Sequence, residues 1–325
     1  MALRIGQVLR GGKGKYELLE QLKGSTVFKA RVVSSLSIQA EWTVVKSAIT
    51  KDEIFTLKRE YRNYQNPEIA SCPHIRTLYD VVRQNEAQEG PIYLVFEWMD
   101  HDLRSTPANV FRSDQRLPRV MSKAALSALT VFKMLNAVHT DISINNIFVS
   151  NIDSPSPIAK LGDLGNLISE GSTQRVQSLP CRAPEVWRGL GCQHCSDVWS
   201  LGVTLAHRLS PQTIFGARDK IIKGFTQAWC IAKIIRLLGP VGQPVDSEAY
   251  REEFELAEQL AVMENPHDGT ELIRIGTLRE ELQRLSDPPV SPQLLDFIEF
   301  LLVIDPSKRP TASEALQHPY LQPFL

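Results

Sequence analysis

The 325-residue sequence has little of what marks membrane, secreted or nucleic-acid-binding proteins. Its 36 basic and 37 acidic residues give a net charge of -1, so no overall field attracts nucleic acid or an acidic membrane. No apolar run reaches the ~20 residues that cross a bilayer, and the opening MALRIGQVLR lacks the apolar segment of a secretory signal. Five cysteines, an odd number, fit a reducing compartment better than a disulfide framework. We therefore expect an intracellular protein of the cytoplasm or nucleus, with neither membrane nor nucleic acid as a partner.

Internal repeats, low-complexity tracts and long Gly/Ser linkers are missing too, which argues against repeat architectures. Before residue 100 the apolar runs are short and rich in β-branched residues, and they predict the strands STVFKARVV, WTVVKSAI and IYLVFEWM. Between the last two, TLKREYRNYQ predicts a helix. After residue 100, helical patterns such as VMSKAALSALTVFKMLNAV dominate. The sequence predicts an α+β fold with a small β-rich part and a larger helical part, and a ligand site between them.

Polar side chains gather in one otherwise apolar stretch, AVHTDISINNIF at residues 137–148. About twenty residues later, KLGDLGN places Asp163 after a second apolar lead-in. Amide and carboxylate oxygens are hard ligands that suit Mg²⁺. Asn146 and Asp163 are therefore candidate metal ligands. Asp141 is left as a candidate base or proton acceptor.

Upstream, a lysine and a glutamate form a second candidate pair. Lys46 ends the strand TVVK, and Glu60 lies in the helix that follows. A strand lysine fixed by a helix glutamate can hold phosphate oxygens in one place.

Together these residues resemble the protein-kinase signature set, in the expected order from about Tyr16 to Leu321. Lys46, Glu60 and Asp141 match the catalytic residues of that family, and Asn146 and Asp163 match its metal ligands. The resemblance implies a bilobal kinase fold with ATP and Mg²⁺ as cofactors. The implied boundaries are an N-terminal extension at 1–15 and a kinase domain at 16–322, divided into an N-lobe at 16–98, a hinge at 97–102 and a C-lobe at 103–322.

The resemblance also implies a nucleotide site. Glu97-Trp98-Met99 matches the hinge, with Phe96 as the gatekeeper, and Asp102 stands where related kinases contact the ribose. The implied nucleotide-binding residues are Lys46, Gly24, Val27, Glu97, Met99 and Asp102.

Later motifs imply a platform for a protein substrate. Ala183-Pro184-Glu185 matches a kinase motif whose glutamate usually pairs with a late arginine, here Arg309. DVWSLG, with Asp197, matches the start of the large central helix. Ser178 stands where Ser/Thr kinases place a threonine, which argues against tyrosine specificity. We expect a monomeric protein serine/threonine kinase.

Small variants point to one branch. His139-Thr140-Asp141, the sequence DLGN and Ser25-Thr26-Val27 all resemble the SR-protein kinase family, and IAKIIRLLGP resembles an insert of that wider group.

Three departures concern the accessory residues. Glu20, Leu22 and Ser25 stand where a glycine loop would have its glycines, so the backbone is less able to approach phosphates. Ser143 replaces a catalytic-loop lysine, which removes a positive charge near the transferring phosphoryl group. Thr140 replaces the arginine that in many kinases receives the activation-loop phosphate.

These departures leave alternatives open. The chain could be a pseudokinase scaffold that binds nucleotide or a partner protein without efficient transfer. A small-molecule phosphotransferase is a third option, although a peptide platform argues against it. Structural roles are favoured for His139, for Asp197 and for the turn Cys192-Gln193-His194-Cys195, which lacks a second pair of zinc ligands. Glu60 could instead lie on a solvated helix face.

Overall fold

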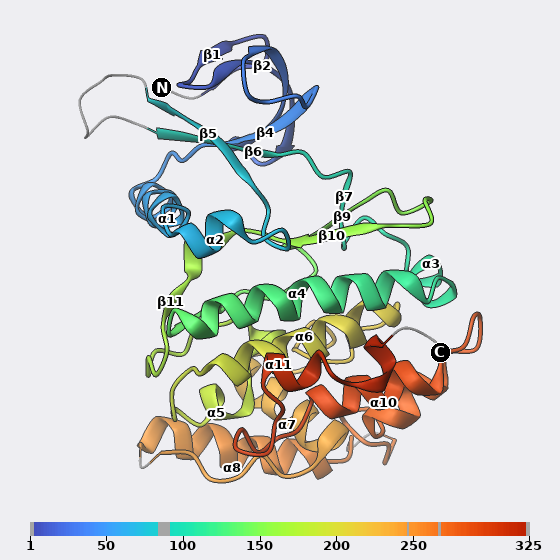
Figure 1. Cartoon of the computed structure of the whole chain (residues 1–325). Coiled ribbons are helices and arrows are strands. Elements are labelled where there is room, and N and C mark those ends of the chain that lie inside the picture. The colour runs from blue at the N-terminus through green and yellow to red at the C-terminus, as the bar shows by residue number, and fades with distance from the viewer. Residues whose placement is uncertain (1–2, 84–91, 246, 266–267, 323–325) are drawn as a thin grey trace. The chain divides into compact units, whose positions relative to one another are not determined.

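The computed structural model describes residues 3–83, 92–245, 247–265 and 268–322 (Figure 1). The chain forms two compact units. The first contains residues 1–100 and 160–167, and the second contains residues 101–159 and 168–325. Each unit is described by itself.

The first unit is built on a six-stranded antiparallel sheet with the order β1-β2-β3-β4-β6-β5. Its strands are β1 (Val8–Arg10), β2 (Gly14–Lys23), β3 (Val27–Ser35), β4 (Trp42–Lys46), β5 (Leu78–Arg83) and β6 (Ile92–Glu97). Alternate residues of these strands are buried together, as the strand period requires, including Tyr16, Leu18, Phe28 and Val45.

β1 lies within residues 1–15 and adds an edge strand to the sheet. Asp80 of β5 holds the turn after it, because its Oδ2 accepts hydrogen bonds from the backbone N–H of Lys13 and the Tyr16 hydroxyl, both at 2.7 Å. A Cβ on Gly11 would lie 2.2 Å from the same oxygen, so a larger residue there would displace the Asp80 carboxylate.

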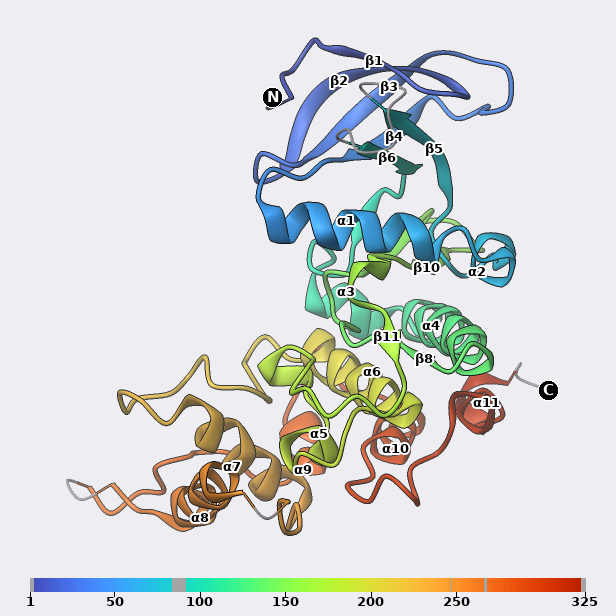
Figure 2. The same cartoon turned by 90° about the vertical axis from the view of Figure 1, so that its left-hand side faces the viewer.

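Helix α1 (Lys51–Asn63) belongs to the same unit. It begins with a capping box, in which Thr50 Oγ1 accepts the N–H of Glu53 and Glu53 Oε2 accepts the N–H of Thr50. The short elements are α2 (Pro67–Ser71), the 3₁₀ turn η1 (Leu164–Asn166) and β10 (Ile158–Leu161), which continues from the second unit into the first. Figure 2 shows α1 along its full length.

The second unit is mainly helical. Its helices are α3 (Ala108–Ser113), α4 (Arg116–Met134), α5 (Pro184–Trp187), α6 (His194–Leu209), α7 (Thr226–Leu238), α8 (Glu248–Val262), α9 (Leu278–Gln283), α10 (Pro292–Leu301) and α11 (Ala312–Ala315). Its shorter elements are β7 (His101–Asp102), β8 (Ala137–Val138), β9 (Ile147–Ser150), β11 (Ile168–Ser169), η2 (Leu179–Cys181) and η3 (Pro319–Leu321).

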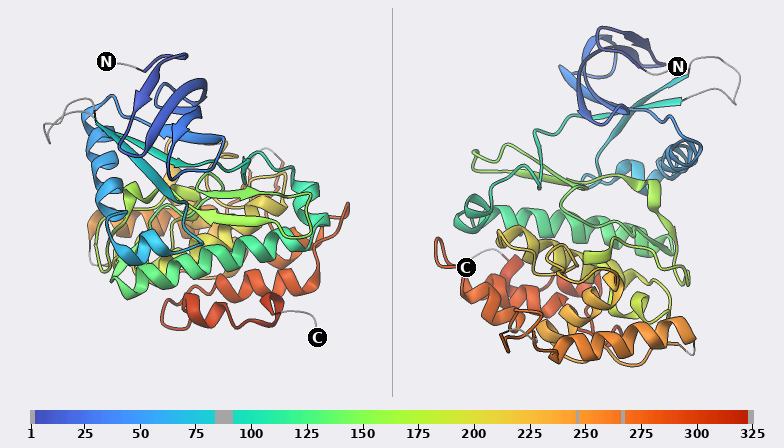
Figure 3. Two further views of the ribbon diagram at one scale, coloured as in Figure 1. Left: turned by 45° about the horizontal axis from the view of Figure 1, so that its top comes forward. Right: turned by 180° about the vertical axis from the view of Figure 1, so that it is seen from behind.

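Helix α6 is the centre of this unit. Every residue from Cys195 to Ala206 is buried, which is the pattern of a helix with neighbours on all sides. Both α4 and α10 pack against it, in green and orange-red in the two views of Figure 3. None of the helices in the described ranges is long and apolar enough to cross a membrane.

The α+β class with a β-rich first part and a helical second part is confirmed. The sequence patterns did not indicate β2 or β5. Lysine, glutamate and glutamine occupy most of the exposed positions of β2, so its apolar signal is weak.

Candidate active site

Three charged side chains meet in the first unit. Lys46 Nζ lies 2.7 Å from Glu60 Oε2 and 2.8 Å from Asp163 Oδ1. Lys46 ends β4, Glu60 belongs to α1, and Asp163 immediately precedes η1. The predicted pairing of Lys46 with Glu60 is therefore present, and Asp163 completes a triad. Only 1% of the Glu60 side chain is exposed, so the solvated-face alternative is wrong.

Helix α1 holds the segment after Asp163 in place. Glu60 Oε1 accepts the N–H of Leu164 at 3.2 Å, and Asn63 Nδ2 donates to the Leu164 carbonyl at 2.7 Å. Arg59 donates to the Gly165 carbonyl and, at 3.1 Å, to Asn166 Oδ1. Asp163 itself adopts a left-handed backbone, with φ of 60°, a costly conformation that its surroundings must stabilise.

Burial and charge act together on the triad. Burial raises the pKa of the Glu60 carboxyl, and the Lys46 ammonium opposes that rise. Burial disfavours the charged form of Lys46, but the carboxylates of Glu60 and Asp163 outweigh it and raise the Lys46 pKa. Lys46 is therefore a fixed cation at neutral pH, suited to holding phosphate oxygens.

The expected glycine loop is the tip of the β2–β3 hairpin. Lys23 pairs with Val27, so residues 24–26 form the turn. Gly24 has φ of +52°, and a side chain there would meet no atom within 4 Å. Glu20 and Leu22 are exposed, and the register shifts on both sides of Glu20. The hairpin is present, but its phosphate-facing glycines are not.

The hinge begins at the end of β6. The Glu97 carboxylate accepts two hydrogen bonds from Lys160 Nζ, at 2.7 and 2.9 Å, and one from the N–H of Thr77 at 3.1 Å. Its backbone carbonyl accepts Arg76 Nε at 2.8 Å. The Glu97 side chain and its backbone carbonyl thus both accept hydrogen bonds within the unit. Met99 is buried.

The catalytic-loop residues lie in the second unit. Asn146 Nδ2 donates to both the backbone carbonyl and Oδ2 of Asp141, each at 2.8 Å. This fixes the direction of the Asn146 amide and leaves Oδ1 as its acceptor for a cation. Asp102, the expected ribose contact, also lies in this unit, where its Oδ1 accepts the N–H of Ser105 at 2.9 Å.

Asp197 supports this loop. Its carboxylate accepts the backbone N–H of His139 at 2.6 Å and that of Thr140 at 3.0 Å. Burial raises the pKa of Asp197 to about 6, against the opposing effects of His139 and these two amides. His139 is fully buried, and its Nδ1 accepts the N–H of Asp141 at 3.2 Å. The structural roles predicted for His139 and Asp197 are confirmed.

The two substituted loop positions are neutral and buried. Ser143 is 8% exposed and Thr140 is 4% exposed. Ser143 Oγ accepts the N–H of Asn145 at 3.4 Å, a weak bond that only helps to close the turn.

Arg175 anchors the segment between Asp163 and Glu185, which is the activation segment of the resemblance. It bonds Glu253 of α8 at 2.5 Å and Gln227 of α7 at 2.9 Å, and it donates to the Trp187 carbonyl at 2.6 Å. Its guanidinium lies 3.6 Å from the ring centroid of Tyr250, a close cation–π contact.

Arg182 and Gln177 tie the segment to itself and to α6. Arg182 donates to the carbonyls of Val176, at 2.9 Å, and Gln177, at 3.1 Å. The Gln177 amide in turn accepts the N–H of Ala183 at 3.0 Å and donates to Ser200 Oγ at 2.9 Å. The segment is therefore held by hydrogen bonds from arginine side chains and a neutral amide.

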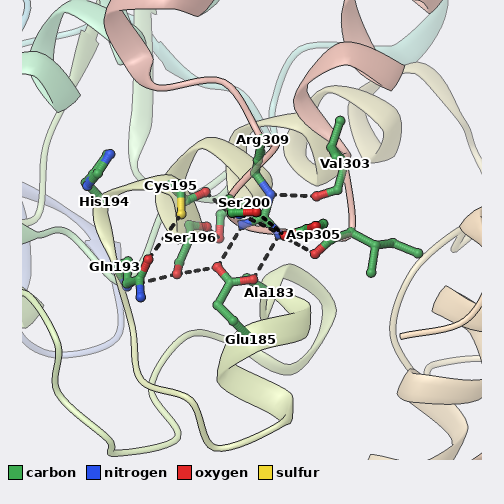
Figure 4. A network of polar contacts seen from close by, with 12 residues as sticks. Ala183, Glu185, Gln193, His194, Cys195, Ser196, Ser200, Val303, Asp305 and Arg309 are labelled. Atoms are coloured by element: carbon green, nitrogen blue, oxygen red, sulfur yellow. Dashed lines mark hydrogen bonds and ion pairs between the residues drawn. The ribbon is translucent and has the colours of Figure 1, made fainter. Parts of the chain in front are cut away.

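The predicted late ion pair is present. Arg309 donates to both oxygens of Glu185, at 2.7 and 2.9 Å, and also to the carbonyls of Val303 and Cys195. Ser196 Oγ donates to the same carboxylate at 2.5 Å, as Figure 4 shows. Close by, Cys192 and Cys195 are free thiols, and the described residues contain no group of three or more His, Cys, Asp or Glu side chains placed to hold a metal.

Sequence reasoning missed Arg76, Arg175 and Gln177. Each is a polar residue whose role depends on partners distant in the chain, and no local spacing marks it. The left-handed φ of 70° at Gln177 shows the strain that its buried bonds offset.

Comparison with known proteins identifies relatives along most of the chain. Cyclin-dependent kinase C-2 C of Arabidopsis thaliana is 31% identical over 314 residues, which are 94% of this chain and 44% of that protein. Mitogen-activated protein kinase 4 of the same plant is 26% identical over 286 residues, covering 84% of this chain and 68% of the relative. Cyclin-dependent kinase B2-2 of Arabidopsis thaliana is 27% identical over 270 residues, covering 78% and 75%.

The chain thus spans less than half of the first of these relatives. Residues 17–321 match the protein kinase domain, which contains every residue of the triad and the catalytic loop. The chain belongs to the protein kinase domain family.

Proposed function

We propose that this chain is an ATP- and Mg²⁺-dependent protein serine/threonine kinase that transfers the γ-phosphoryl group slowly. The observation that carries this proposal is the triad of Lys46, Glu60 and Asp163. This geometry carries two unfavourable free-energy terms: the burial of the Glu60 carboxylate and the left-handed backbone of Asp163. A scaffold that binds no nucleotide would have no need to keep both.

The residues divide the work. Lys46, oriented by Glu60, holds phosphate oxygens of the nucleotide. Asp163 and Asn146 supply the hard oxygen atoms that would hold Mg²⁺, which neutralises charge on the phosphates when bound. Asp141 orients the substrate hydroxyl and accepts its proton. The Asn146 amide donates to Oδ2 of Asp141, which fixes the direction of that carboxylate, and also to the Asp141 backbone carbonyl. Glu185 and Arg309 stabilise the substrate platform.

The proposed branch is the SR-protein kinase family, within the wider group that contains cyclin-dependent and mitogen-activated kinases. The support is local: the sequences HTD and DLGN, and the segment IAKIIRLLGP, whose first eight residues lie in α7. A protein serine or threonine is the proposed acceptor. A monomer inside the cell is the proposed state.

The second candidate is a nucleotide-binding scaffold, favoured by Glu20 and Leu22 at the hairpin tip and by Ser143 in the loop. Labelled ATP and a Ser-rich substrate separate the two. The wild type should transfer label, and Asp141→Ala should not. Asp141→Asn is the matched control, because it keeps the volume and the hydrogen bond to the chain but not the base. Equal incorporation by the wild type and both variants would support the scaffold.

A further inference from the structure

A buried arginine lies beside the hinge. Arg76, two residues before β5, is only 8% exposed. Its Nε donates to the carbonyl of Glu97 at 2.8 Å, and its guanidinium carbon lies 5.8 Å from the ring centroid of Phe96. The Tyr64 ring also packs against the Phe96 ring, and their centroids are 5.4 Å apart. A buried guanidinium is retained only where partners compensate its lost hydration.

The charges around Arg76 belong to the site already described. Burial lowers its pKa, and Tyr64, Glu97, Glu60 and Asp163 oppose that change. Arg76 is therefore within electrostatic reach of the triad carboxylates, and it is a second cation beside Lys46. The Tyr64 hydroxyl in the same cluster is buried and has no hydrogen-bond partner in the described part of the chain.

The bond to Glu97 changes what the hinge offers to a base. Adenine carries a donor, its 6-amino group, where guanine and hypoxanthine carry an oxygen acceptor. A backbone carbonyl suits the amino group. Here that carbonyl already accepts a charge-assisted bond, which is stronger than a neutral one. A nearby positive charge also repels the amino hydrogens and attracts a 6-oxo group.

We infer that Arg76 is a specificity-determining residue of the nucleotide site: it removes the usual advantage of adenine and favours purines with an oxygen at position 6. The inference rests on the proposed function, since it requires a nucleotide held by Lys46. It predicts a kinase domain that uses 6-oxo purine triphosphates at least as well as ATP.

The experiment measures dissociation constants of the full chain for Mg·ATP and Mg·ITP by competition with a fluorescent nucleotide. ITP is the matched probe, since it differs from ATP only in the 6-oxo group and the N1 proton. The wild type should bind ITP at least as tightly as ATP. Arg76→Met, which keeps length and apolar volume, should shift the ratio at least tenfold toward ATP. Arg76→Lys should keep the wild-type preference.

Arg83→Met is the surface control, because Arg83 ends β5, the strand that follows Arg76, and is exposed. It should leave the ratio unchanged. If Arg76 had only a structural role, Arg76→Met would weaken the binding of ATP and ITP equally. An unchanged ratio of the two dissociation constants would therefore overturn the inference. If Arg76→Met does not fold, the wild type can be tested with purine riboside triphosphate, which lacks the 6-amino group. If the wild type binds it tenfold more weakly than ATP, the inference is overturned.

Failure of the proposed function has a different signature. In that case no nucleotide binds, or Lys46→Met and Asp163→Ala leave the binding of every nucleotide unchanged. Failure of the inference alone leaves binding dependent on Lys46 but a base preference independent of Arg76.

Discussion

Arg309 and Glu185, 124 residues apart in the chain, form a two-bond ion pair whose side chains are 0% and 1% exposed. Trp199 covers the guanidinium, whose carbon lies 5.1 Å from the centroid of that ring. A charge buried this completely cannot recover its hydration when its partner is removed.

We therefore predict that Glu185→Ala destabilises the protein by about 3–5 kcal/mol. The loss should be measured from the urea midpoint and slope. Glu17→Ala is the control, because Glu17 pairs with Arg31 at 2.6 Å on the surface, where such pairs contribute about 1 kcal/mol or less. Equal losses in the two variants would contradict the prediction.

His207 should make stability depend on pH. Its Nε2 accepts the N–H of Phe215 at 3.1 Å, and burial, with a smaller effect of Lys233, lowers its pKa to about 4. The unfolded chain therefore binds the proton first as the pH falls below ~6.5. Stability from this group is complete above that pH and declines toward pH 4, by about 2 kcal/mol at pH 5.

His207→Gln keeps an acceptor but cannot titrate. Its free energy of unfolding should fall less steeply than that of the wild type between pH 7 and pH 5. The difference between the two curves isolates His207 from the carboxylates that titrate in the same range. Parallel curves would show that His207 is not the group responsible.

The sequence predicted those site residues that their immediate neighbours in the chain make recognisable. Lys46 ends a strand, Glu60 lies in the next helix, and Asp163 stands two residues before Gly165. Each is marked by its local sequence, and the structure places all three in contact. Arg76 has none: in HIRTLYD it resembles any charged strand residue. Its burial follows from Phe96, Tyr64 and the Glu97 carbonyl, which only the folded sheet brings together.

The activation segment illustrates the same limit. Thr140 indicated from the sequence that a phosphate receptor is missing, but it gave no sign of what replaces it. Arg175 meets Tyr250 and Glu253, which come from a helix about 75 residues later in the chain. Edge strands such as β1 were also missed, because three residues carry too short a pattern for periodicity to detect.

Nucleotide binding should require Mg²⁺ and Asp163. The triad keeps a lysine for phosphate and a carboxylate for the cation, so Mg·ATP at ~100-fold above its dissociation constant should stabilise the fold by ~2.7 kcal/mol. The measurement is the melting temperature with ATP, with and without Mg²⁺. Asp163→Ala should abolish the Mg²⁺-dependent shift. A wild type that shows no shift at any ATP concentration would contradict the prediction.

Activity should not depend on phosphorylation of the activation segment. Thr140 removes the usual cationic receptor, and Arg175 is already paired with Glu253. Phosphatase treatment should leave the transfer rate unchanged, although Ser169, Ser172, Thr173 and Ser178 are possible acceptors. Arg175→Ala should lower the rate with either treatment, since the carboxylate of Glu253 then has no partner. Loss of most activity after phosphatase alone would refute this account.

The last prediction concerns Ser143. Its hydroxyl is buried in the turn and accepts the N–H of Asn145 at 3.4 Å. A serine hydroxyl is neutral, so it brings no charge to the phosphoryl group. Charge-assisted hydrogen bonds are roughly twice as strong as neutral ones, and loss of one preorganised donor costs ~2.7–4 kcal/mol, or ~10²–10³ in rate. We expect a slow wild-type kinase in which Ser143→Lys raises kcat.

The gain in kcat should stay below that ~10²–10³, for two reasons. Ile144 replaces the proline that commonly shapes this loop, and the new lysine must extend out of a buried turn. Ser143→Met is the matched control, with similar length and no charge. Single-turnover transfer from labelled ATP separates the chemical step from binding. Ser143→Lys should exceed both the wild type and Ser143→Met, while the dissociation constant for ATP changes little. If the lysine and methionine variants are equally slow, the missing charge does not limit transfer, and the eroded hairpin tip at Glu20 and Leu22 becomes the cause to test.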